Sequence, residues 1–98
     1  MNVIKEIPID TFIHYDTFEA FLIDHNNKRY IVEHYCAGSE DEYIGVVIYD
    51  IENMKYISIN NTFEPNYIEF IKNGKWQDII VENNEHVIKY YKQILYEN

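Results

Sequence analysis

The sequence predicts an α+β fold, in which an antiparallel β-meander of four to five strands is followed by two C-terminal helices packed on one face. Short runs rich in β-branched and aromatic residues, separated by polar turns, fill the chain as far as Asn60. After Asn61 the apolar period changes from 2 to about 3.6 residues, which indicates helices. No repeat, linker or low-complexity segment divides the 98 residues, so we expect a single domain over residues 1–98.

The first predicted elements are an edge strand and a hairpin. The edge strand lies within residues 1–9, because Pro8 disfavours a central position. The hairpin strands, Thr17–Asp24 and Arg29–Cys36, are rich in aromatic and β-branched residues, and residues 25–28 between them read His-Asn-Asn-Lys. Asn adopts positive φ readily, so this tetrapeptide suits a tight turn.

Two more strands complete the predicted meander. Tyr43–Asp50 is apolar on both faces, which is typical of a central strand. In Lys55–Asn60 the side chains of Ile57 and Ile59 alternate with Tyr56 and polar residues, which predicts a sheet that meets water on one side. A polar loop over residues 37–42 precedes these strands, and residues 51–54 turn the chain between them.

The helices are predicted from apolar spacing and from capping residues. Pro65 suits the first turn of a helix and Gly74 suits its end. Trp76–Val81 fits either a strand or more helix. Asn83 or Asn84 can cap a last helix, whose apolar face has helical spacing. That face consists of Val87, Ile88, Tyr91, Ile94 and Leu95.

Charge is the strongest functional signal in the chain. It has 17 acidic and 8 basic residues, a net charge of −9, and Tyr30–Met54 contains six acids and no Lys or Arg. A field of this sign attracts basic surfaces and repels nucleic acid and anionic membranes. We therefore expect a basic protein as partner, and neither nucleic acid nor membrane.

The predicted partner surface combines these carboxylates with nearby tyrosines, which supply contact area at low entropic cost. The alternative for each tyrosine is packing in the core or at the rim of the sheet, and for the acidic loop Ser39–Glu42 it is simple solvation. The predicted contact residues are Glu33, Tyr35, Glu40, Asp41, Glu42, Tyr43, Asp50, Glu52 and Tyr56.

No motif for catalysis or metal binding is present. The strand pair His34 and Cys36 offers two of the four ligands that a structural zinc ion needs, and no CxxC or HxxxH accompanies it. Gly-rich phosphate loops and nucleophile motifs are missing as well. We expect no catalytic residue, no metal and no cofactor. The sequence contains one cysteine, no recognisable signal peptide and no long apolar run. We therefore expect a cytoplasmic protein.

In size, acidity, aromatic content and missing catalytic motif, the whole chain resembles the immunity proteins of bacterial toxin systems. These include barstar-like inhibitors, colicin immunity proteins and the immunity proteins of contact-dependent growth inhibition. The resemblance implies an inhibitor, one monomer in a heterodimer, that occludes the active site of a basic toxin or nuclease domain, with an RNase as the leading candidate.

Three other functions stay open at the level of sequence. One is a phage-type nucleic-acid mimic that blocks a defence nuclease, which would share the electrostatics and differ in its target. Another is a small enzyme or ligand-binding domain, whose site would be assembled from residues distant in sequence. The last is an oligomeric or structural module. Binding that collapses in salt would separate the inhibitor and the mimic from the other two.

Overall fold

The computed structural model describes residues 2–14, 16–37, 43–60, 67–80 and 82–96. This part of the chain forms strands, α-helices and two short 3-10 helices. In order they are β1 (Asn2–Glu6), η1 (Ile9–Thr11), β2 (Thr17–His25), β3 (Lys28–Ala37), β4 (Tyr43–Asp50), β5 (Lys55–Asn60), α1 (Tyr67–Asn73), η2 (Lys75–Ile79), β6 (Glu82–Asn83) and α2 (Glu85–Tyr96).

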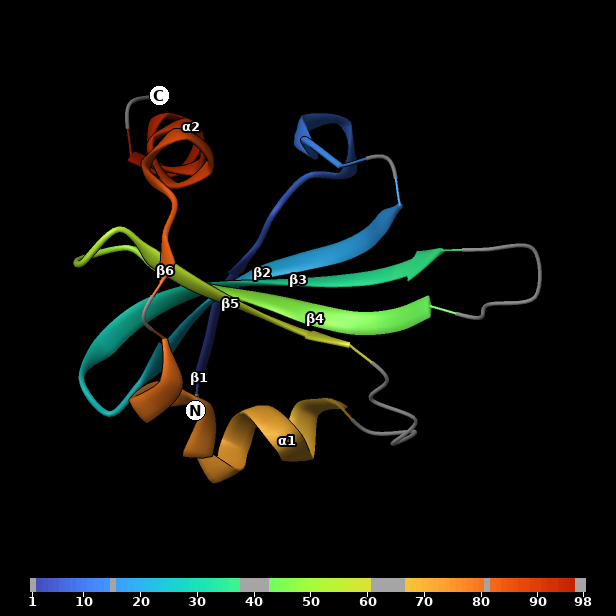
Figure 1. The fold of residues 1–98 in the computed structure, drawn as a ribbon. Coiled ribbons are helices and arrows are strands. Elements are labelled where there is room, and N and C mark those ends of the chain that lie inside the picture. Colours follow the sequence, from blue (N-terminus) through green and yellow to red (C-terminus); the bar gives the residue numbers. More distant parts are fainter. Residues whose placement is uncertain (1, 15, 38–42, 61–66, 81, 97–98) are drawn as a thin grey trace.

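The strands form one antiparallel sheet in the order β1-β2-β3-β4-β5-β6, so each pairs with its neighbour in sequence (Figure 1). This confirms the predicted α+β meander, including its edge strand β1. The described sheet has 6 strands, one more than the larger predicted number. The additional strand, β6, is a two-residue segment that pairs with Lys55 and Tyr56, and so short a segment shows no alternation in the sequence.

The β2–β3 turn is built by two asparagines, as the sequence predicts. Asn26 has a φ of 50° and Asn27 a φ of 66°. Two consecutive central residues with positive φ define a type I′ turn, whose twist matches that of the flanking strands. The Asn26 Nδ2 also donates to Gln77 Oε1 at 2.9 Å, which ties the turn to η2.

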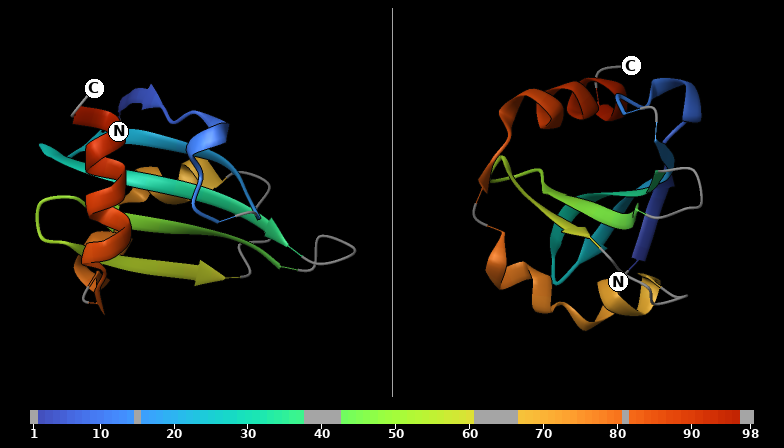
Figure 2. Two further views of the ribbon diagram at one scale, coloured as in Figure 1. Left: turned by 90° about the horizontal axis from the view of Figure 1, so that it is seen from above. Right: turned by 45° about the vertical axis from the view of Figure 1, so that its right-hand side comes forward.

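Helices cover both faces of the sheet (Figures 1 and 2). Helix α2 lies over one face, called the α2 face below, and α1 with η2 lies over the other, the α1 face. We therefore correct the prediction that both helices share a face and that the other side meets water. The physical reason is that β2, β3 and β4 carry apolar side chains on both faces, and each of these surfaces has to be buried.

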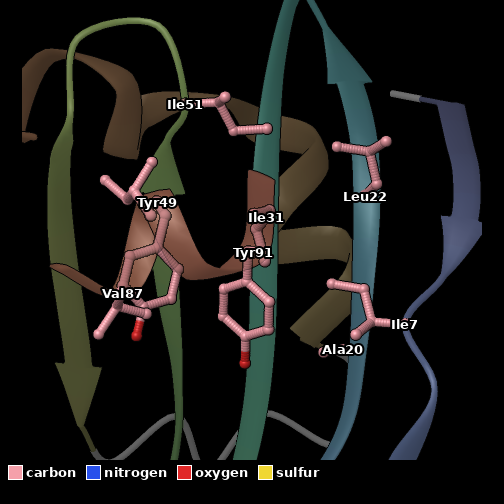
Figure 3. Close-up of a cluster of buried hydrophobic side chains, with 9 residues drawn as sticks. Ile7, Ala20, Leu22, Ile31, Tyr49, Ile51, Val87 and Tyr91 are labelled. Atoms are coloured by element: carbon pink, nitrogen blue, oxygen red, sulfur yellow. The ribbon is translucent and has the colours of Figure 1, made fainter. Parts of the chain in front are cut away.

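Each face of the sheet has its own buried cluster. On the α2 face (Figure 3) it consists of Ile7, Ala20, Leu22, Ile31, Tyr49, Ile51, Val87, Ile88 and Tyr91. On the α1 face it consists of Ile23, Tyr30, Val32, Val46, Ile48, Ile71, Trp76 and Ile80. The register keeps the two sets apart, because directly paired residues point to the same face of an antiparallel sheet.

The start of α2 and the end of α1 are set by residues next to them in the sequence. Asn84 Oδ1 accepts the backbone N–H of Val87 at 3.3 Å, which confirms the predicted cap of α2. Gly74 has a φ of 73° and follows the last residue of α1, as predicted; Pro65 lies outside the described residues. Of the predicted range Trp76–Val81, residues 76–79 belong to the 3-10 helix η2, and Val81 lies outside the described residues. Trp76 is buried, and its Nε1 donates to the Ile71 carbonyl at 2.8 Å.

In the described part of the chain, no helix combines the length and the apolarity needed to cross a membrane.

Candidate functional site

The predicted contact residues fall into three groups in the structure. Glu40, Asp41 and Glu42 lie outside the described residues, and of Tyr43 only the backbone is described, at the start of β4. The remaining five do not form one surface. Glu33 and Tyr35 lie near one end of the sheet, Asp50 and Glu52 near the opposite end, and Tyr56 on β5 close to β6.

Glu33 is a core residue of the α2 face, with only 1% of its surface exposed. The Tyr49 hydroxyl donates to its Oε1 at 2.6 Å, and the Tyr91 hydroxyl donates to its Oε2. Figure 3 shows these two rings with their hydroxyls turned toward the same end of the cluster. A buried carboxylate without such donors would cost several kcal/mol, so the two tyrosines are what allows Glu33 to be buried. Glu33 is therefore not a free surface contact.

The two tyrosines remain protonated donors over the whole physiological range. Burial, and then the adjacent Glu33 carboxylate, raises the pKa of Tyr49 well above its ordinary value. The same two causes, in the same order, raise the pKa of Tyr91. The two phenols therefore stay available as hydrogen-bond donors to Glu33 throughout the physiological range.

A hollow of about 170 Å³ opens beside this carboxylate. Glu33 forms part of its wall, and His14 lies toward the outside, with its side chain 45% exposed and its Nδ1 3.5 Å from Glu33 Oε1. The residues that line the hollow are His14, Asp16, Thr17, Glu33, Tyr35 and Val47. Sequence reasoning found Glu33 and Tyr35 but missed how they combine with the segment before β2.

Two local features hold the walls of this hollow. Tyr35 pairs directly with Gly45 on β4, and a Cβ atom at Gly45 would lie 2.4 Å from the Tyr35 hydroxyl oxygen. The glycine therefore makes room for the tyrosine ring across the neighbouring strand. The backbone N–H of Cys36 donates to the Asp16 carbonyl at 3.0 Å, which fixes the segment before β2 against β3.

Asp50 organises the β4–β5 turn. Its Oδ1 accepts the backbone N–H groups of Glu52 and Asn53, both at 3.1 Å, and its Oδ2 accepts Asn53 Nδ2 at 2.9 Å and Lys28 Nζ at 3.3 Å. Burial alone would raise the pKa of Asp50, but the hydrogen bonds from Asn53 and Lys28 outweigh it and hold that pKa below its ordinary value. These bonds make Asp50 a turn residue rather than a partner contact.

The other two predicted residues are partly accessible. Glu52 is exposed and lies 4.0 Å from Lys28 Nζ. Tyr56 is half-buried and stacks on Tyr49, with ring centroids 6.1 Å apart. A hydrogen bond to Glu82 raises the pKa of Tyr56. Tyr56 therefore acts mainly as a packing residue at the margin of the α2 face.

A second hollow, of about 460 Å³, lies at the end of the sheet where the β2–β3 and β4–β5 turns meet the last turn of α2. It is lined by Asn27, Lys28, Arg29, Ile51, Glu52, Lys92 and Tyr96. Three of these residues are basic, in a chain with only eight. This concentration is not visible in the sequence, because the three lysine and arginine positions come together only when α2 packs on the sheet.

The two ends of the sheet differ in charge. The acidic end, defined as residues 16–19 of β2 and its approach, 33–37 of β3 and 43–47 of β4, contains Asp16, Glu19 and Glu33 and no Lys or Arg. The turn end, defined as residues 25–29 and 50–55, contains Lys28, Arg29 and Lys55 together with Asp50 and Glu52.

Among the described residues, no three His, Cys, Asp or Glu side chains are grouped closely enough to hold a metal ion. Comparison with protein-family models, with curated proteins and with solved structures found no match to this chain.

Proposed function

We propose that the protein is an inhibitor of the immunity-protein type, which binds a basic protein through the acidic end of its sheet. A toxin nuclease, such as an RNase, is the first candidate for this partner. The observation that carries the proposal is the separation of charge along the sheet. At the acidic end Glu33 and Glu19 have tyrosine and histidine neighbours, whereas at the turn end a lysine pairs with Asp50 and Glu52.

This arrangement suits a nuclease as target for an electrostatic reason. A nuclease active site is positively charged because it binds the phosphates of its substrate. A partner that presents carboxylates without competing cations complements that field, which speeds encounter and fixes orientation. The exposed ring of Phe18, at the same end, supplies an apolar contact of the kind found in the middle of interfaces.

The acid-only stretch adds to this field. Glu40, Asp41 and Glu42 belong to the segment that connects β3 to β4 along the chain, and both strands contribute to the acidic end. Their addition makes the connection between these strands the most acidic segment of the sequence. We therefore include the three residues in the proposed contact surface.

A capture experiment with an activity readout tests the proposal. The tagged protein is used as bait in lysate of its source cells at low salt, and captured basic proteins are assayed for nuclease activity with and without added inhibitor. We expect one nuclease to be captured at low salt and inhibited at a one-to-one ratio. A captured protein whose activity is unchanged by the inhibitor, or no specific capture, would contradict the proposal.

Two triple variants then locate the contact surface. Replacing Glu40, Asp41 and Glu42 with Lys should slow association at least about tenfold, because electrostatic steering depends on the local field. Replacing the exposed Glu52, Glu69 and Asp78 with Lys changes the net charge equally but leaves the acidic end intact, and should slow association much less. Equal effects of the two triples would remove the acidic end from the interface.

A ligand-binding domain is a second candidate, favoured by the hollow at the turn end. Its volume of about 460 Å³ falls within the range of about 300–1,000 Å³ that is typical of small-molecule sites. Lys28, Arg29 and Lys92 would favour an anionic ligand. Thermal-shift screening of phosphate and carboxylate compounds, with Lys92→Ala as the comparison, tests this candidate.

A further inference from the structure

We propose that the hollow at the acidic end is a socket for a guanidinium group, and that an arginine side chain of the protein partner occupies it. The identity of the donor rests on the proposed function, since the inhibitor must have a basic partner. The affinity of the hollow for the group rests only on residues of this chain. The two parts can therefore be tested separately.

Glu33 is a buried anion with more hydrogen-bond acceptor positions than its two tyrosine donors use. A carboxylate offers about four lone-pair positions, two on each oxygen. The Tyr49 and Tyr91 hydroxyls occupy one position on each oxygen of Glu33. Glu33 is also one of the residues that line the hollow, which places this anion beside an open space. His14 approaches only to 3.5 Å from the outside and is half-exposed, so it can give way to an entering group.

The size of the hollow suits a single side-chain group. A hollow of about 170 Å³ is smaller than the roughly 300–1,000 Å³ of sites that enclose a whole small molecule. It has room for one functional group and its first methylene carbons. A side chain that projects from a larger partner fits this volume, whereas a free metabolite of ordinary size does not.

The residues that line the hollow also have the chemistry that suits a guanidinium group. Asp16 adds a second, half-buried carboxyl group, and Thr17 and Tyr35 add hydroxyl groups. Among the described residues that line the hollow there is no Lys or Arg to offset its two carboxylates. Val47 and the Tyr35 ring provide apolar surface. A guanidinium needs this combination, because its edge carries a fork of N–H donors while its flat faces are weakly hydrated and stack on rings.

The same lining residues favour an arginine over a lysine side chain. An ammonium group is a compact, strongly hydrated point charge that gains little from an aromatic wall. A guanidinium can place N–H groups on two carboxylates at once while its face packs on the ring. Glu33 and Asp16 both line one small hollow, which suits the planar, multiply donating group better.

Titration of the complete chain with small cations tests the socket without any partner. Ethylguanidinium chloride is added to the ¹⁵N-labelled protein at constant ionic strength, with ethylammonium chloride as the second probe. We expect saturable shifts of the backbone signals of residues 14–17, 33–35 and 45–47 with ethylguanidinium, and binding about tenfold weaker with ethylammonium. Absence of saturable shifts in these residues, or equal binding of both cations, would overturn the inference.

Three variants show which carboxylate is responsible. Asp16→Asn should weaken ethylguanidinium binding about tenfold, because one charge-assisted hydrogen bond is lost while the half-buried residue remains similar in shape. Glu33→Gln should weaken it further, and Asp16→Asn carries the test if the Gln variant does not fold. Glu52→Gln at the turn end should leave binding unchanged. Unchanged binding in Asp16→Asn would contradict the socket.

Once a partner is known, Asp16→Asn also distinguishes the guanidinium socket from the proposed inhibitor function. If the partner binds Asp16→Asn as tightly as the natural chain, the socket is wrong and the inhibitor proposal stands. If ethylguanidinium binds the hollow but no basic partner is captured, the proposed function fails and the guanidinium site stands.

Discussion

The acidic end and the turn end of the sheet use acidic residues in opposite ways. At the turn end, Asp50 accepts four hydrogen bonds, one of them from Lys28, and holds a tight turn together. At the acidic end, Glu33 is held by two phenols and Glu19 lies 3.1 Å from His34 Nδ1. The first arrangement pairs a carboxylate with a lysine, whereas the second holds the Glu33 carboxylate with neutral phenol donors. A net charge of −9 conceals this difference.

The largest effect is expected for Glu33→Ala. The variant leaves the Tyr49 and Tyr91 hydroxyls buried without their acceptor and creates a void, which should reduce the free energy of unfolding by about 3–5 kcal/mol. Urea denaturation followed by circular dichroism measures the change. Glu19→Ala, a partly exposed acid at the same end, is the control and should cost less than about 1 kcal/mol. Similar losses would mean that burial does not distinguish the two acids.

The next effect is expected for Asp50→Ala at the turn end. Loss of the acceptor for two backbone N–H groups and for Lys28 should cost about 2–3 kcal/mol. Asp50→Asn keeps one acceptor oxygen and should recover part of this loss. If both variants were as stable as the natural chain, the turn would be held by the strands and not by the carboxylate.

Tyr91→Phe should have a smaller effect, about 1.5–3 kcal/mol, because it removes one hydrogen bond to a buried carboxylate and keeps the ring. Tyr30→Phe on the α1 face removes only the acceptor of Gln77 Nε2, which donates to that hydroxyl at 2.9 Å, and should cost about 1 kcal/mol. The difference between the two midpoints of urea unfolding reports the contribution of the charge on Glu33. Equal shifts would indicate that the carboxylate adds nothing to the bond.

The smallest effect concerns His25, the last residue of β2 at the turn end. It is buried against Trp76, and its Nδ1 has no hydrogen-bond partner among the described residues. Burial, the largest of the causes, lowers its pKa below the ordinary histidine value of 6.5. The unfolded chain therefore takes up a proton first as the pH falls below 6.5, so stability is full above that pH and declines beneath it.

This pH dependence is checked by comparing thermal unfolding at pH 7.5 and 5.5 in the natural chain and in His25→Gln. The loss of stability between the two pH values should be smaller in the variant. His86 is exposed at the start of α2, and His86→Gln should keep the loss seen in the natural chain. A loss that is unchanged in His25→Gln would assign it to other groups.

The strands and α2 could be predicted because their signals are local. Asn26 and Asn27 specify the hairpin turn, alternation specifies the strands, and Asn84 specifies the start of α2. The face that α1 covers could not be predicted, because an apolar strand shows that it is buried but not which segment buries it. The two-residue strand β6 has no periodicity to detect.

The candidate site was predictable only in part, for a similar reason. An acidic residue such as Glu33 is expected at the surface, and its burial depends on tyrosines 16 and 58 residues further along the chain. A signal was nevertheless present, because Glu33 shares a strand face with Ile31, which belongs to the core. Asp50 also carried a local signal, since an aspartate followed by two residues of a turn commonly accepts their N–H groups.

The meander order has a consequence for how the molecule is made. Because each strand pairs with its neighbour in sequence, the sheet can form hairpin by hairpin during synthesis from the N-terminus. Glu33 acquires one donor when β4 pairs, but its second donor, Tyr91, arrives only with the last helix. Until then, burial of Glu33 would leave its charge with one tyrosine donor instead of two. We expect docking of α2 to be the final, committing step of folding, so that an incomplete chain cannot close its core prematurely.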